Sequence, residues 1–176
     1  MRLKLLAAAA AAMTLTGCAA DVNVSEKSYL RAAAVDGDKI TLSFFAEEDE
    51  VLTVTAASPD EAKSAAELAT GKQIFTGYTE LIVLGDCDSR ETLSFMLREW
   101  KVSPSCIVAC PKGSGEKLLA SRTAEELEGA VKVAQEQELA GECDVITALG
   151  GLLNGKGTVD VPILSEKGFC GTVDLK

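Results

Sequence analysis

The sequence predicts an α/β fold, a single domain in which a mixed sheet of about four to five strands is packed with helices. Three observations predict it. Short apolar runs alternate along the chain with segments that begin with helix-capping residues. Residues 81–84 are Leu-Ile-Val-Leu, and a run without polar residues is typical of a central strand that is buried on both faces. Near the start, two β-prone runs flank Asp36-Gly37-Asp38, a turn signal that predicts an N-terminal β-hairpin.

The first part of the domain is predicted to be all strand. Residues 29–35 and 39–45 form the hairpin, and residues 51–55 are a third β-prone stretch. The acidic run 47–50 lies between them. It is interpreted as a solvated loop rather than a cation site, because it has no glycine to place the oxygens as a calcium loop does.

Further strands are predicted later in the chain. The segment 74–85 contains the central apolar run, and residues 105–110 predict a short buried strand. Pro162 interrupts the β-prone residues 158–164, and proline cannot donate to a strand ladder. This segment is therefore predicted to be at most an edge strand, with residues 165–176 as a C-terminal tail.

Five helices are predicted from capping residues and apolar periodicity. Ser58 and Glu61 form a capping box, Pro59 fits the first turn and Gly71 marks the end of the first helix. The helices are expected over residues 59–70, 89–100, 116–122 and 124–139, and from residue 145 onward, with Asp88, Thr123 and Asp144 as start signals. The side chains of the last helix that are expected to face the core are Val145, Ile146, Leu149 and Leu153.

The N-terminus predicts export. Arg2 and Lys4 form a positive start, and residues 5–15 carry no charge over a length that is too short to span a bilayer of ~30 Å. The run ends in Leu15-Thr16-Gly17-Cys18, which has the lipobox pattern of an aliphatic residue, two small residues and a cysteine. Small residues let the signal peptidase approach the backbone, and the thiol accepts the diacylglycerol.

These features predict a lipid-anchored protein. We expect a signal peptide at 1–17, lipidation at Cys18, a lipidated tether at 18–27 and the folded α/β domain at 28–164. The expected location is the outer face of the cell membrane, with the membrane itself as a partner through the lipid on Cys18.

Composition excludes several function classes. Removal of the first 17 of 176 residues leaves 159 and changes the formal net charge from −10 to −12. A strongly acidic chain is not expected to bind nucleic acid. The chain has no histidine, the commonest general base and metal ligand. We therefore predict no catalytic residue, no cofactor and no metal. An enzyme is not expected, and a hydrolase that uses carboxylates is a minor alternative without a marked pair.

The remaining cysteines and glycines suggest no site. Five cysteines follow Cys18, at positions 87, 106, 110, 143 and 170, and no CxxC pair exists. Free, buried thiols are favoured over a disulfide framework or a metal site. The stretch 150–157 nearly matches a P-loop, but Gly157 follows the lysine where the motif needs Ser or Thr. The loop 113–115 is interpreted as a plain connection rather than an anion site.

Residues 71–119 resemble the N-terminal domain of the spore germination receptor C-subunit lipoproteins, the Ger(x)C family. The similarity consists of a basic residue, an aromatic-glycine step and an aliphatic strand that ends in glycine, here 72–85, then a Leu-Arg segment at 93–100 and a strand and loop at 106–113. The end of the early strand at 33–36 resembles the family's G-I-D turn, with Ala34 in place of the glycine. Tyr78 stands where the family has histidine.

The resemblance implies a subunit rather than an enzyme. Ger(x)C lipoproteins sit on the outer face of the spore's inner membrane with two integral membrane subunits, in complexes that start germination in response to nutrients. Members of the family carry further domains, so this chain resembles a one-domain version. The alternative function is a general surface lipoprotein that binds a small ligand or an envelope component.

Overall fold

The computed structural model describes residues 27–45, 50–154 and 157–176. The predicted signal peptide, Cys18 and the tether up to residue 26 lie outside the described residues, as do acidic positions 47–49.

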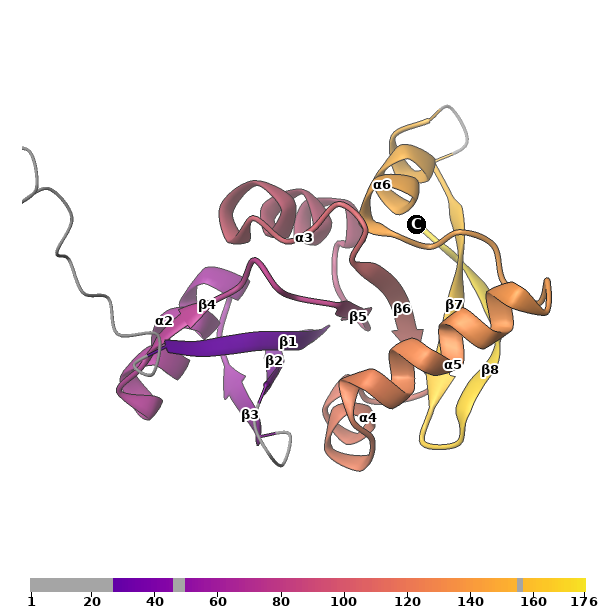
Figure 1. Ribbon diagram of the computed structural model, residues 1–176. Coiled ribbons are helices and arrows are strands. Elements are labelled where there is room, and N and C mark those ends of the chain that lie inside the picture. The colour runs from indigo at the N-terminus through magenta and orange to yellow at the C-terminus, as the bar shows by residue number, and fades with distance from the viewer. Residues whose placement is uncertain (1–26, 46–49, 155–156) are drawn as a thin grey trace, which may run out of the picture.

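One mixed sheet organises the described chain (Figure 1). Its strands are β1 (Lys27–Asp36), β2 (Lys39–Phe44), β3 (Glu50–Thr55), β4 (Gln73–Phe75), β5 (Leu81–Leu84), β6 (Ile107–Pro111), β7 (Val159–Ser165) and β8 (Gly168–Leu175). The order is β3-β2-β1-β5-β6-β7-β8, with β4 paired to β1. Strands β1, β5, β6 and β7 run parallel, and β2, β3 and β8 add antiparallel edges.

The α/β class with a mixed sheet is confirmed, and β1 pairs with β2 around the Asp-Gly turn. The expected strand number is too small, because the sheet has eight strands. Two of them, β4 and β8, were not predicted as strands. The strand β4 has three residues, and β8 lies in the segment that was expected to be a tail.

Four of the five α-helices of the described residues begin where their capping residues predict, and α4 begins one residue before the predicted position 116. They are α2 (Pro59–Thr70), α3 (Ser89–Phe95), α4 (Gly115–Ser121), α5 (Ala124–Glu136) and α6 (Val145–Leu153), with a π-helical turn, η2 (Met96–Trp100), continuing α3. Side chains of Ser58, Asp88, Thr123 and Asp144 each accept a hydrogen bond from the backbone N–H three residues later, at 3.3, 2.8, 3.2 and 2.7 Å. Such caps satisfy donors that a helix start leaves free.

Helices cover both faces of the sheet, which gives three layers (Figure 1). The helices α2, α3 and α6 pack on one face, and α4 and α5 pack on the other. Neighbouring positions of the central strand β5 point alternately to the two layers: Ile82 joins the first core and Val83 the second, and both are fully buried. This explains the unbroken apolar run, since neither face of the strand meets water.

The C-terminal part of the chain corrects two predictions. The segment with Pro162 is not an edge strand, because β7 lies between β6 and β8. Its ladder with β6 consists of Cys110 with Ile163 and Pro111 with Leu164, after the proline, so the missing N–H is not needed on that side. The expected tail is β8, the antiparallel partner of β7.

Two helix details also differ from the prediction. Helix α5 ends at Glu136 rather than near residue 139. In α6, Ile146 and Leu153 are 52% and 60% exposed, while Ala148 and Leu152 are buried. Almost every residue of α6 is apolar or glycine, so the helix has no polar face from which its orientation can be predicted.

Candidate functional site

A β-bulge in β1 aims Arg31 out of the regular ladder. Leu30 pairs with Phe44 and Ala32 pairs with Ser43, so Arg31 is the extra residue between two consecutive pairs. Its Nε donates to Glu80 at 2.9 Å, and its Nη2 donates to Glu125 at 3.1 Å. Arg31 therefore links β1 to the residue before β5 and to helix α5.

Aromatic side chains gather beside this bulge. The register of β1 with β4 places Tyr29 opposite Phe75. The rings of Tyr29, Phe75 and Tyr78 lie within 5.2–5.9 Å of one another. The Arg31 guanidinium lies 4.8 Å from the ring centre of Phe45, and the Phe45 N–H donates to the carbonyl of Tyr29. We call these four residues, Tyr29, Phe45, Phe75 and Tyr78, the aromatic patch.

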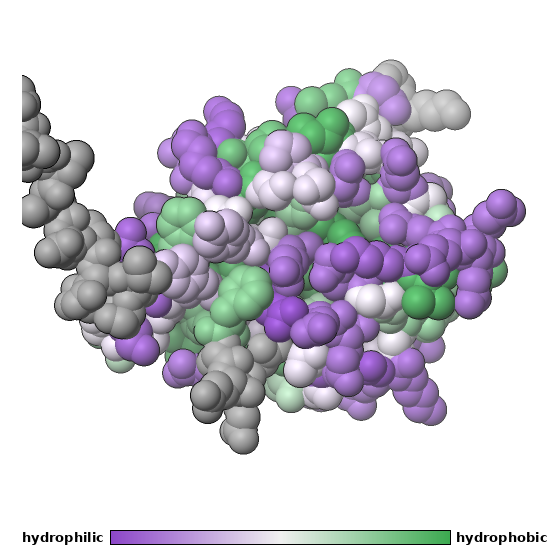
Figure 2. All heavy atoms as spheres, in the orientation of Figure 1, coloured by the Kyte–Doolittle hydropathy of each residue, from purple (hydrophilic) through white to green (hydrophobic). Residues whose placement is uncertain are grey.

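The aromatic patch is open to solvent. Phe45, Phe75 and Tyr78 are 42%, 40% and 63% exposed. Figure 2 shows apolar and weakly polar side chains at the left of this face, whereas strongly polar side chains cover α4 and α5. Half of the chain's eight aromatic residues belong to the patch. A contiguous exposed patch of this kind marks an interaction surface more often than scattered exposed residues do.

A hollow of about 290 Å³ adjoins the aromatic patch. It lies near the amino ends of β5 and β6, and is lined by Phe45, Gly77, Tyr78, Thr79, Glu80, Ser103, Ser105, Cys106 and Glu128. Its carboxylates have cationic partners, because Glu80 pairs with Arg31 and Glu128 with Lys132, at 2.9 and 2.6 Å.

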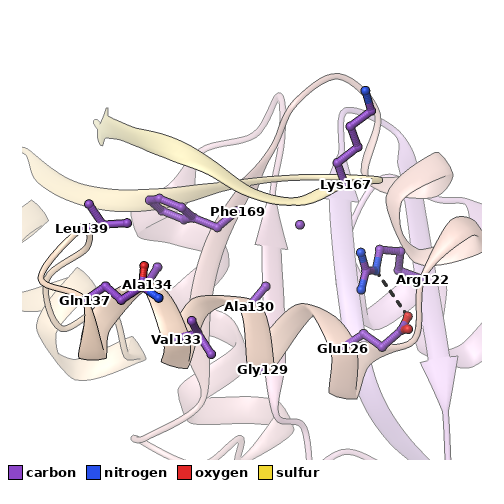
Figure 3. Close-up of a pocket in the computed structure, with 11 residues that line it drawn as sticks. Arg122, Glu126, Gly129, Ala130, Val133, Ala134, Gln137, Leu139, Lys167 and Phe169 are labelled. Carbon is purple, nitrogen blue, oxygen red and sulfur yellow. Dashed lines mark hydrogen bonds and ion pairs between the residues drawn. The ribbon is translucent and has the colours of Figure 1, made fainter.

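A second hollow is a groove between α5 and β8 (Figure 3). It has a volume of about 420 Å³. The Arg122–Glu126 ion pair, at 3.3 Å, lies at one end, and Leu139 and Phe169 lie at the other. Between them, Ala130 lines the groove. The groove thus offers an apolar surface next to charged groups and holds none of the residues singled out from the sequence.

A third hollow, of about 290 Å³, lies at the carboxyl ends of β1 and β5. Ligand sites are common at this edge of parallel sheets. Here the polar groups hold the fold together. Asp88 caps α3, and Asp36 accepts hydrogen bonds from the N–H groups of Asp86 and Gly115, both at 3.3 Å. Cys87 also lines the hollow, and burial raises the pKa of its thiol, helped by nearby carboxylates and opposed by a hydrogen bond with Thr92. Cys87 is therefore not an activated nucleophile.

The five cysteines in the described part of the chain are all free thiols, as predicted. Only Cys106 and Cys143 are fully buried, while Cys87 and Cys110 are half-buried and Cys170 is exposed. Burial raises the pKa of the Cys106 thiol, and raises the pKa of Cys110 and Cys143 to about 11. Near neutral pH these three residues are therefore present mainly as thiols, and the reactive thiolate is scarce.

We therefore expect that one thiol reacts rapidly with a thiol reagent while the protein is folded. At pH 8, Cys170 will react first with Ellman's reagent because it is exposed. Cys110 and Cys143 will react at least about tenfold more slowly, since a pKa near 11 leaves roughly one thiolate in a thousand at that pH. The rate is measured by absorbance, and Cys170→Ser should remove the fast phase. Rapid reaction of two or more thiols would contradict the assignment.

Two further findings concern metals and membranes. Among the described residues, no group of three or more Cys, Asp and Glu side chains is placed to hold a metal ion. Within the same part of the chain, no helix is long and apolar enough to cross a membrane.

The aromatic patch was not singled out from the sequence. Tyr29 and Phe75 are 46 positions apart, and only the pairing of β1 with β4 brings them together. The one available signal was Phe75 and Tyr78 close together in a chain with 5% aromatic residues. The segments that resemble the Ger(x)C family supply β4, β5, η2 and β6. No family model matches the sequence, and no curated protein or solved structure is significantly similar to it.

Proposed function

We propose that this protein is an exported lipoprotein that acts through protein–protein contacts at the outer face of a membrane, as a C-type subunit of a nutrient germination receptor. The observation that carries the proposal is the lipobox Leu15-Thr16-Gly17-Cys18 after a charged start and an apolar run. The resemblance of residues 71–119 to the Ger(x)C lipoproteins supports the germination role.

The surface of the domain is compatible with a binding role. Its exposed aromatic side chains are of the kind that is enriched both in protein interfaces and where a membrane meets water. The patch adjoins Lys27, where β1 begins, nine positions after Cys18. The expected partners are the integral membrane subunits of the receptor.

The experiment follows the tagged full-length protein through vegetative cells and purified spores, with membrane fractionation of each. The expected result is appearance only during sporulation, in the spore inner membrane, and slower germination with nutrients after deletion of the gene. Steady presence in membranes of growing cells, together with unchanged germination, would contradict the receptor role and leave the lipid anchor unaffected.

The groove between α5 and β8 favours the second candidate, a surface lipoprotein that binds a small ligand. Its volume of about 420 Å³ is in the range of small-molecule sites. A ligand that binds only the folded state raises the melting temperature. Thermal scans of the protein with candidate envelope components test this function, and Ala130→Trp, which fills the groove, should abolish any shift.

A further inference from the structure

We infer that the aromatic patch seats the domain on the lipid headgroup layer of the membrane that holds its anchor. This inference rests on the lipid anchor of the proposed function and not on its germination role. It names lipid, rather than a protein, as the occupant of the exposed surface formed by Tyr29, Phe45, Phe75 and Tyr78.

The length of the tether limits where the domain can be. Nine residue steps separate Cys18 from Lys27. A fully extended chain of that length reaches about 30 Å. The start of β1, and with it Tyr29, therefore stays close to the bilayer surface. Tethering also makes the contact intramolecular, at an effective concentration on the order of millimolar, so a weak contact is populated.

The chemistry of the aromatic patch suits the headgroup layer. Tyrosine has an apolar ring with a polar hydroxyl, and such side chains are enriched where hydrocarbon meets water. Tyr78 is the most exposed of the four, contacts the ring of Phe75 and lines the adjoining hollow together with Phe45. One ring of this kind enters the interface while its hydroxyl stays hydrated.

The charges around the aromatic patch allow this approach although the protein is acidic. Lys27 pairs with Gln73 in the sheet, and Lys72 precedes Gln73. These two lysines stand two and three positions before Tyr29 and Phe75 in the chain. Cations at this position attract anionic headgroups.

The described carboxylates that bond Arg31 or line the adjoining hollow are paired with cations. Glu80 and Glu125 bond Arg31, and Glu128 bonds Lys132. The strongly polar surface over α4 and α5 lies to the other side of the patch in Figure 2. Contact through the aromatic patch therefore leaves the strongly polar surface over α4 and α5 to one side of the lipid contact.

The test places a fluorescent reporter in the aromatic patch of the lipidated mature protein. The side chain of Tyr78 is 63% exposed, so the Tyr78→Trp variant should fold as the parent does. The proteins are reconstituted in phosphatidylcholine–phosphatidylglycerol vesicles with or without brominated acyl chains, which quench nearby tryptophan. Leu139→Trp, 57% exposed beyond the end of α5, is the matched control, and buried Trp100 gives the background in the parent.

The expected result is that Tyr78→Trp loses most of its added emission in brominated vesicles, while Leu139→Trp and the parent do not. If the Tyr78→Trp variant floats with the vesicles but emits equally in both vesicle types, the inference is overturned. The lipid anchor is not contradicted by that result, and a protein becomes the expected partner of the patch. Failure of the parent to float with vesicles is a different outcome. It contradicts the lipid anchor and the inference together.

Discussion

Replacement of Cys18 by alanine is expected to release the protein from the membrane. Each methylene of a bound acyl chain that enters the bilayer contributes ~0.8 kcal/mol, so a cysteine with several chains is a durable anchor. Docking through the aromatic patch alone is weak and depends on the tether. The variant should therefore take up no labelled palmitate and should move from the detergent phase to the aqueous phase.

A second cysteine variant is the control for this experiment. Cys170 is exposed in β8 and free, and Cys170→Ala should leave lipid labelling and phase partition unchanged. If Cys18→Ala still took up palmitate and partitioned into detergent, the lipobox assignment would be wrong. Loss of labelling in both variants would point to a general export defect rather than to the loss of one acceptor thiol.

Replacement of each of two adjacent glycines of α6 by alanine is expected to change the free energy of unfolding in opposite directions. A Cβ on Gly151 would lie 2.5 Å from the Cβ of Val159, which begins the neighbouring strand β7. This contact involves an atom next to the backbone, so the helix or the strand must shift, and overpacking of this kind costs ~1–3 kcal/mol. A Cβ on Gly150 meets nothing within 4 Å. Gly150→Ala should stabilise the protein by ~0.5–1 kcal/mol through the higher helix propensity of alanine.

Urea unfolding of the two variants and the parent measures the difference. The midpoint should fall for Gly151→Ala and rise for Gly150→Ala, with the slope unchanged in both cases. The comparison removes the effect of helix propensity, because the same substitution is made in the same helix. Shifts of the same sign and size in the two variants would show that α6 does not pack against β7 as closely as the structure describes.

Features that depend on a few neighbouring residues were predictable. The caps at Ser58, Asp88, Thr123 and Asp144 each bond a backbone group only three residues away, so the chain needs no tertiary contact to select them. The strand at 81–84 was predictable for a related reason, because burial on both faces requires every side chain to be apolar.

Features that depend on pairing between distant segments could not be predicted from the sequence. Strands that contain proline generally lie at the edge of a sheet. Here β7 lies inside the sheet, because its short ladder with β6 does not include Pro162. In the same way, Cys170 and its neighbours become a strand because β7 supplies the partner. The aromatic patch exists because a bulge at Arg31 and the β1–β4 register gather side chains from three segments.

The sequence by itself determined the α/β class, the starts of the helices and the buried central strand, and it predicts the anchor at Cys18. The tertiary structure alone decided the number of strands, the face that α6 turns to the core and the place where the exposed aromatic rings meet. The physical reason is the range of the interactions. Caps and apolar runs act within one element, whereas sheet edges, helix faces and surface patches depend on which distant segments pair.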